Sequence, residues 1–332
     1  MGKLFGKDLI EKVKCAQSAQ IIQPVQIGQT DRKNELVFFI KPELFNVDDD
    51  EKIINSLNLI EEEFNAFQVD VRGTAILPGQ VLAEYQIMNR HYGFINQLSR
   101  MASEMLDHET RQQMFEMLSE EDRGEHQILG GHEFLGKYQT TIEALNDIWF
   151  GKGAKKLRSG FYFIEDTYKG DPILMVNGFH PSQLMHFTHP DHRIMLMLIH
   201  TDSDWYDLKF DLVGDTFPER ANPGSIRGQL FAHPEKYGQD HVGINTNGVH
   251  LSAGPFEAAF EVVNFFGQLL SLAPEKTPPL AIRHAIEAGI DKTLALSFLD
   301  NPAVNGSDLF SETENLNTNQ AIAFAKQQIM GG

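Results

Sequence analysis

The sequence has little cysteine, no long apolar run and a charged beginning. Cys15 is the only cysteine among 332 residues, so the chain cannot close an internal disulfide, which fits a reducing compartment. No stretch of about 18 apolar residues occurs, so we expect no membrane span. The first 14 residues carry charges where a secretory signal needs an apolar run. A cytoplasmic protein is therefore expected.

Basic residues are also scarce. The chain has 28 Lys and Arg against 46 Asp and Glu, for a net charge of −18, which argues against nucleic-acid binding through a general basic field. A phosphate loop of the form Gly-x-x-x-x-Gly-Lys-Ser/Thr is missing. These absences still allow a small basic pocket for phosphate. The hydrophobic fraction of 42% is typical of a globular protein, and the length favours about two domains.

Outside residues 101–192, short apolar runs alternate with helical periodicity. The patterns predict strands at 35–40, 68–77, 194–199 and 248–252, and helices over 52–66, over 79–100, from about 204, and over 255–272. This order suits an α+β fold, a ferredoxin-like sandwich with an antiparallel sheet.

The composition also divides the chain. Residues 35–100 and 193–272 would form one discontinuous domain, interrupted by a mixed helical and strand insertion at 101–192. In that insertion, 101–148 reads as helical. Residues 1–34 and 273–332 would be extensions, the second with one helix near 279–299 before Asn- and Ser-rich sequence.

The first motif with chemical potential is Asn247-Gly-Val-His250-Leu-Ser252, followed by Glu261. A histidine at the end of a short strand can present its ring to a cleft. A carboxylate on one ring nitrogen fixes the tautomer and leaves the other nitrogen as a nucleophile. The alternative interpretation is a surface or core histidine followed by a serine that caps a helix.

Two further segments could supply positive charge. Arg227 lies in a loop rich in Pro and Gly that begins near Gly214-Asp215-Thr216, and a guanidinium can donate paired hydrogen bonds to phosphate. Lys41 ends the first predicted strand and could face the same anion. Each has an ordinary alternative, a solvated arginine on a surface loop and an exposed lysine at a strand end.

Together these pieces resemble the nucleoside diphosphate kinase family. Phe38-Phe39-Ile40-Lys41-Pro42 resembles its opening strand, residues 214–228 its threonine and long loop, and residues 247–252 with Glu261 its active-histidine motif. The resemblance covers 35–100 and 193–270, about half the chain, and rests on the shared order of the motifs.

The resemblance implies a ping-pong transferase of nucleotide metabolism. His250 would take the γ-phosphoryl group of ATP or another nucleoside triphosphate and pass it to a nucleoside diphosphate, with Glu261 and Ser252 orienting the ring. The residues implied to hold the phosphates and ribose are Lys41, Tyr85, Thr216, Arg227 and Asn247. Mg²⁺ would bridge the phosphates, with no metal ligand expected from protein side chains. A homo-oligomer is implied, and a dimer is favoured.

The sequence departs from the family at two arginines. The family places one six residues after the tyrosine, where this chain has His91; a slip of one residue would give Arg90 the phosphate role and Tyr92 the role of stacking on the base. Phe210 stands at the second position, where the neighbouring Lys209 could substitute.

These departures leave open a second function, a catalytically weak or inactive nucleotide-binding or scaffolding module of the same fold. A histidine phosphatase is a third interpretation, but the flanking Val249 and Leu251 lack the arginine expected beside such a histidine. The histidines of the insertion match no metal fingerprint, so structural or solvent-exposed roles are favoured for them.

Overall fold

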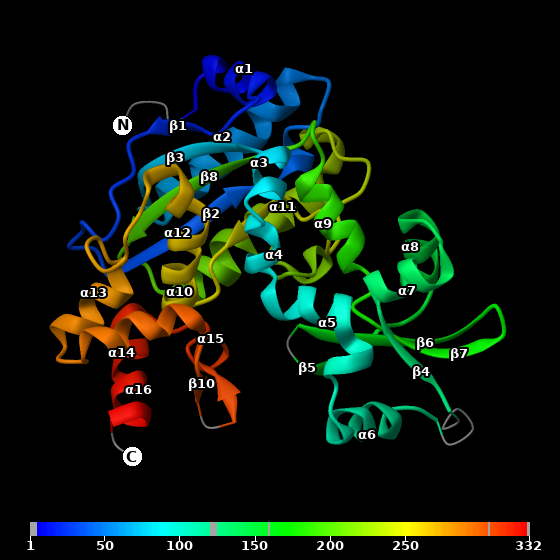
Figure 1. Ribbon diagram of the computed structural model, residues 1–332. Coiled ribbons are helices and arrows are strands. Elements are labelled where there is room, and N and C mark those ends of the chain that lie inside the picture. Colours follow the sequence, from blue (N-terminus) through cyan, green and yellow to red (C-terminus); the bar gives the residue numbers. More distant parts are fainter. Residues whose placement is uncertain (1–4, 120–124, 159, 305, 331–332) are drawn as a thin grey trace. The chain divides into compact units, whose positions relative to one another are not determined.

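The computed structural model describes residues 5–119, 125–158, 160–304 and 306–330 (Figure 1). The chain divides into two compact units. Unit 1 contains residues 1–85 and 189–332, and unit 2 contains residues 86–188. The first four residues of the predicted amino-terminal extension lie outside the described residues. None of the described helices is long and apolar enough to cross a membrane.

Unit 1 is built on a five-stranded sheet in the order β1-β3-β8-β2-β9, in which every neighbouring pair is antiparallel. Its strands are β1 (Gln20–Gln23), β2 (Asn34–Ile40), β3 (Asp70–Pro78), β8 (Arg193–Thr201) and β9 (Val249–Leu251), with a separate hairpin of β10 (Ala303–Val304) and β11 (Ser307–Asp308). The four strands predicted from the apolar runs are present as β2, β3, β8 and β9. Unit 1 is thus an α+β arrangement with an antiparallel sheet.

Helices flank this sheet and form the carboxyl-terminal part of unit 1. They are α1 (Lys7–Cys15), α2 (Asp50–Ala66), α3 (Gly79–Glu84), α10 (Trp205–Asp207), α11 (Ile226–Ala232), α12 (Pro255–Leu270), α13 (Leu280–Glu287), α14 (Lys292–Ser297), α15 (Leu309–Glu312) and α16 (Thr318–Met330). Short turns of other helix types are η1 (Pro42–Leu44), η3 (Leu208–Val213), η4 (Pro218–Arg220), η5 (Pro234–Tyr237) and η6 (Phe298–Asp300).

Strand β2, which lies between β8 and β9, is buried along its whole length. Side chains of a strand point alternately to opposite faces. Phe38 accordingly packs against Phe64 of α2, with ring centroids 4.9 Å apart, whereas Phe39 packs against Phe265 of α12 at 5.4 Å. Helix α2 therefore lies on one face of the sheet and α12 on the other. Odd-numbered residues of β2 face α12.

Unit 2 has a four-stranded sheet in the order β4-β7-β6-β5, with β4 and β7 parallel and the other pairs antiparallel. Its elements are α4 (Ile87–His91), α5 (Gly93–Met105), α6 (His108–Glu116), β4 (Gln127–Gly130), α7 (Gly131–Tyr138), α8 (Ile142–Phe150), β5 (Lys155–Arg158), β6 (Phe161–Tyr168), β7 (Asp171–Val176) and α9 (His180–Thr188). Its core includes Phe161, Phe163 and Leu174.

Three predicted helices differ from the structure. The helix predicted over 79–100 is broken into α3, α4 and α5, and Gln86 between the first two adopts a left-handed backbone with φ of 52°. The region 101–148, expected to be helical, contains strand β4, which pairs with β7 far along the chain. The helix predicted near 279–299 is divided into α13 and α14 at Gly289, whose φ is +90°. A positive φ ends an α-helix at such positions.

Candidate functional site

His250 lies in the middle of the edge strand β9, opposite Phe39 of β2. The two rings stack with their centroids 4.4 Å apart and their planes 18° from parallel. Because Phe39 faces α12, the imidazole lies on that same face of the sheet. The side chain of His250 is 19% exposed, so the ring is packed on one side but still accessible.

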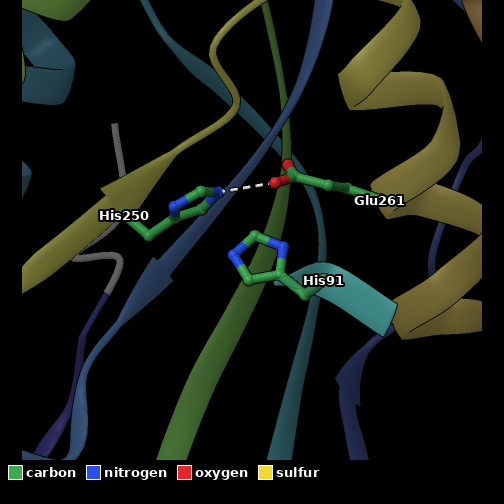
Figure 2. Close-up of side chains that lie close together, drawn as sticks. All are labelled: His91, His250 and Glu261. Carbon is green, nitrogen blue, oxygen red and sulfur yellow. Dashed lines mark hydrogen bonds and ion pairs between the residues drawn. The ribbon is translucent and has the colours of Figure 1, made fainter. Parts of the chain in front are cut away.

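Glu261 of α12 holds one ring nitrogen of His250 (Figure 2). Its Oε1 lies 2.8 Å from Nε2 of His250, and the carboxylate has no exposed surface. The other oxygen, Oε2, accepts a hydrogen bond from the hydroxyl of Ser252. That hydroxyl in turn accepts from the backbone N–H of Val37 at 2.9 Å, which ties Ser252 to strand β2. His91, the third side chain drawn in Figure 2, belongs to unit 2.

The carboxylate sets the tautomer of the imidazole. A carboxylate with both oxygens accepting hydrogen bonds can only be an acceptor, so Nε2 of His250 is assigned as the protonated nitrogen. In a neutral imidazole the lone pair is then on Nδ1. The arrangement is that of an oriented nucleophile backed by a buried carboxylate.

The surroundings keep His250 uncharged. Burial is the main cause that lowers its pKa well below the usual value, and the positive charges of Lys41 and Arg227 lower it further. The ring is therefore neutral near pH 7, which is the nucleophilic form. The two cations that act on the ring are themselves buried, in a protein of net charge −18.

Lys41 follows the end of β2 and is almost fully buried, with 7% of its surface exposed. Its Nζ donates to Oδ1 of Asn247 at 2.6 Å, and the Asn247 amide donates to the backbone carbonyl of Thr216 at 3.1 Å. Burial lowers the pKa of Lys41 to about 8; the nearby Glu43 raises it and Arg227 lowers it. A phosphate anion beside this ammonium would offset the cost of its burial.

Arg227 lies in the first turn of α11, whose amino end is capped by the Ser225 hydroxyl. One terminal nitrogen donates to the carbonyl of Gly214 at 2.9 Å and the other to the carbonyl of Val249 at 2.8 Å. The guanidinium therefore joins the loop at Gly214 to the strand that carries His250. Gly214 has a φ of +95°, a conformation that side chains disfavour, and this allows the loop to turn there.

The structure distributes the sequence-predicted residues between the two units. Unit 1 brings His250 together with Ser252, Glu261, Lys41, Arg227 and Asn247. Thr216 is exposed, and its backbone carbonyl meets Asn247. Tyr85 follows α3 in unit 1 and is 39% exposed. Arg90 and Tyr92 belong to unit 2, where the ring of Tyr92 packs against His180 and Phe187 at 5.8 and 6.1 Å. Their nucleotide roles stay predictions.

Two neighbours of the site were not predicted. Phe39 supports the imidazole ring, and Glu43 accepts a hydrogen bond from the backbone N–H of Gly248 at 2.9 Å beside Lys41. The period-2 alternation of the strand could have indicated Phe39, since residues 39 and 41 point to the same face. Lys209, considered as a substitute for a missing arginine, donates to Glu314 of the carboxyl-terminal region instead.

Comparison with known proteins adds little. No protein-family model and no curated protein matches the chain. Among solved structures, an NDP kinase from Pyrobaculum aerophilum is similar to 72% of this chain over 99% of its own length, with 16% sequence identity and a TM-score of 0.35. So low a score does not establish a shared fold, and the chemistry must be argued from the site itself.

Proposed function

We propose that this chain is a nucleoside diphosphate kinase-like phosphotransferase that works through phosphorylated His250. The observation that carries the proposal is the fixed imidazole: Glu261 holds Nε2 at 2.8 Å, while Lys41 and Arg227 act on the same ring as positive charges. A neutral, oriented nucleophile beside two cations is what attack on a polyphosphate requires. Phosphoryl transfer depends mainly on positioning and charge stabilisation.

In the first half-reaction, the lone pair on Nδ1 of His250 attacks the γ-phosphorus of a nucleoside triphosphate. The bond between that phosphorus and the bridging oxygen breaks, and the nucleoside diphosphate leaves with the electron pair. The ring keeps its proton on Nε2 and becomes positively charged. Glu261, already within hydrogen-bond distance of Nε2, stabilises that charge.

The second half-reaction reverses the first with a different diphosphate. A terminal oxygen of the acceptor attacks the phosphorus, the P–N bond breaks, and the ring returns to its neutral form. The same site therefore serves both nucleotides in a ping-pong sequence. Lys41 and Arg227 balance the phosphate charge in both directions, and Asn247 keeps the lysine ammonium in place.

Other predicted properties extend this proposal. The strand order β3-β8-β2-β9 with α2 between β2 and β3 supports a ferredoxin-like domain for unit 1. Mg²⁺ would arrive with the nucleotide, bound by its phosphates, because the Glu261 oxygens already accept from His250 and Ser252. Tyr85, Arg90, Tyr92 and Thr216 remain candidates for nucleotide contacts, and a dimer remains the proposed assembly.

The decisive experiment is incubation of the full chain with γ-³²P-labelled ATP and Mg²⁺. We expect an acid-labile, base-stable label that moves to added GDP and is absent from His250→Ala. His233→Ala, which removes an exposed histidine beyond α11, is the matched control and should label like the wild type. Equal labelling of His250→Ala would reject the proposal. ATP-dependent thermal stabilisation of an unlabelled wild-type chain would instead favour a non-catalytic nucleotide-binding module.

A further inference from the structure

Glu43 lies in η1, two residues after Lys41, and is buried next to the candidate site. Only 8% of its surface is exposed. Acidic side chains are seldom buried unless an opposite charge or several hydrogen bonds compensate for the lost water. The hydrogen bonds that orient His250 run through Glu261 and not through this carboxylate. The burial of Glu43 therefore needs a separate explanation.

One oxygen of Glu43 holds the segment that leads into strand β9. Its Oε1 accepts a hydrogen bond from the backbone N–H of Gly248 at 2.9 Å, and the carbonyl of Gly248 accepts from the backbone N–H of Lys41 at the same distance. Both backbone polar groups of Gly248 are thus bound by residues 41 and 43. Because Gly248 lies two residues before His250, these bonds fix the start of the strand that carries the imidazole.

The same carboxylate acts on the buried ammonium of Lys41. That residue is 7% exposed, and its Nζ donates to the carboxamide of Asn247 at 2.6 Å, a bond to a neutral group that supplies no negative charge. Burial is the main cause that lowers the pKa of Lys41 to about 8, and Arg227 lowers it further, whereas Glu43 raises it. Glu43 thus favours the charged form of the lysine.

In the described part of unit 1, three other charged or titratable groups belong to this site. Arg227 of α11 is a cation and repels the ammonium of Lys41. His250 of β9 is neutral, because burial first and then Lys41 and Arg227 lower its pKa well below the usual value. Glu261 of α12 is bound to the imidazole at 2.8 Å. Glu43 is therefore the carboxylate placed to balance the charge of the lysine.

We propose that Glu43 is a positioning residue of this site, which holds the start of β9 and serves as the counterion of the Lys41 ammonium. That the ammonium is kept charged for a phosphate rests on the function proposed above. A buried cation beside an anion costs less free energy than a lone one. When a polyphosphate binds, its negative charge adds to that of Glu43, so the lysine stays protonated during transfer.

An NMR titration of Lys41 tests the counterion role without any nucleotide. In the full chain labelled with ¹³C-lysine, the Cε resonance that is absent from Lys41→Arg reports when the ammonium loses its proton. We expect Glu43→Gln to lower the midpoint by about one pH unit, because the amide keeps an oxygen for Gly248 but has no charge. The matched control Glu235→Gln removes an exposed carboxylate of η5 and should leave the midpoint unchanged. An unchanged midpoint in Glu43→Gln would overturn the proposal.

The pH profile of labelling with γ-³²P-ATP measures the consequence for the reaction. The labelling rate of the wild type should fall as pH rises through about 8, and that of Glu43→Gln should fall about one pH unit lower. A change in stability alone would not move this midpoint. Coinciding midpoints in wild type and Glu43→Gln would contradict the counterion role.

Glu43→Ala separates the two parts of the proposal. It removes the charge, like Glu43→Gln, but also removes the acceptor for the N–H of Gly248. At pH 6, where Lys41 is largely protonated in both variants, we expect His250 to be labelled about tenfold more slowly in Glu43→Ala than in Glu43→Gln. Equal rates would contradict the positioning role.

These measurements also distinguish this proposal from the proposed function. If the wild-type chain takes up no label, the phosphotransferase proposal fails, and the NMR midpoints still decide whether Glu43 is the counterion of Lys41. If the chain is labelled on His250 and Glu43→Gln leaves the midpoint of Lys41 unchanged, the proposed function stands and the role of Glu43 is refuted.

Discussion

The rings of Phe39 and His250 stack 4.4 Å apart across neighbouring strands, and Phe39 also packs against Phe265 of α12 at 5.4 Å. The imidazole is thus held from two directions. Phe39 fixes the plane of the ring, and Glu261 fixes its rotation through Nε2. Neither contact depends on a nucleotide, so the nucleophile is oriented before substrate arrives.

Because Phe39 supports the imidazole and Phe38 does not, we expect substitutions at both positions to lower stability but only one of them to slow the reaction. Phe39→Leu should destabilise the fold by about 1–2 kcal/mol and slow labelling of His250 about tenfold, because the ring loses its support. Phe38→Leu is the matched control, since its side chain faces α2. It should cost similar stability and leave the labelling rate unchanged. Urea unfolding and single-turnover labelling measure the two quantities, and equal slowing in both variants would contradict the role of Phe39.

A second histidine–glutamate pair lies in the same sheet but serves the fold. Nε2 of His200 lies 2.9 Å from Glu35, whose oxygens also accept from the backbone N–H groups of Gly28 and Leu280 at 2.6 and 2.7 Å. The side chain of His200 has no exposed surface, whereas that of His250 is 19% exposed. Substrate can therefore reach His250 but not His200.

We expect Glu35→Ala to lower the free energy of unfolding by about 3 kcal/mol, because it removes three buried hydrogen bonds and leaves their donors unpaired. The labelling rate of the folded fraction should stay at the wild-type value. Chemical denaturation with parallel labelling measures both. A folded variant that is stable but unlabelled would show that Glu35 acts on the reaction and not on the fold.

Much of unit 1 could be predicted because its apolar runs are short and bounded. The run 35–40 corresponds to β2 at Asn34–Ile40, and the amphipathic pattern at 255–272 corresponds to α12 at Pro255–Leu270. The break at Gln86 could not be predicted, because only tertiary contacts hold a non-glycine residue at a φ of 52°. Strand β4 was not predicted from the hydrophobic pattern, because its four residues are too few to show an alternation.

The sequence indicated which residues belong to the candidate site better than it indicated which of them touch one another. The motif around His250 and the eleven-residue spacing to Glu261 indicated an oriented ring, and the two side chains meet at 2.8 Å. Strand register determines that Phe39, and no other aromatic of β2, lies opposite His250. Register depends on pairing between segments more than 200 residues apart, which no local pattern contains.

The buried ammonium of Lys41 predicts a pH dependence of both activity and stability. Its pKa of about 8 in the folded chain lies below the 10.5 of an unperturbed lysine. Below pH 8 both states carry the charge, and the cost of burying it is fully present. Between pH 8 and 10.5 the unfolded chain binds a proton that the folded chain has released, so the free energy of unfolding rises with pH.

Comparison with Lys41→Met isolates this effect. The difference in unfolding free energy, wild type minus variant, should increase by about 3 kcal/mol from pH 7.5 to 10.5. Over the same range the labelling rate of the wild type should fall as the charge beside the phosphates disappears. Denaturant titrations at several pH values measure the first quantity. A difference that does not change with pH would show that Lys41 keeps its proton.

For Glu257 we expect the opposite pH dependence of the free energy of unfolding. Its pKa is raised to about 8, mainly by burial and in addition by the negative charges of Glu261 and Glu314. Below pH 4.5 both the folded and the unfolded chain hold the proton. Between pH 4.5 and 8 only the folded chain holds it, so the free energy of unfolding falls as pH rises, and above pH 8 the full cost of the buried charge is present.

Glu257→Gln should therefore be more stable than the wild type by about 4 kcal/mol at pH 8.5, with little difference at pH 4. The control Glu275→Gln removes an exposed carboxylate and should show no such divergence. At pH 7 the wild-type Glu257 is mostly protonated and already resembles a neutral glutamine, so labelling of His250 should be nearly unchanged there. Parallel stability curves for wild type and Glu257→Gln from pH 4 to 8.5 would instead mean that Glu257 is ionised beside Glu261. The negative charge of Glu257 would then repel that of Glu261, the carboxylate that orients His250, over this whole pH range.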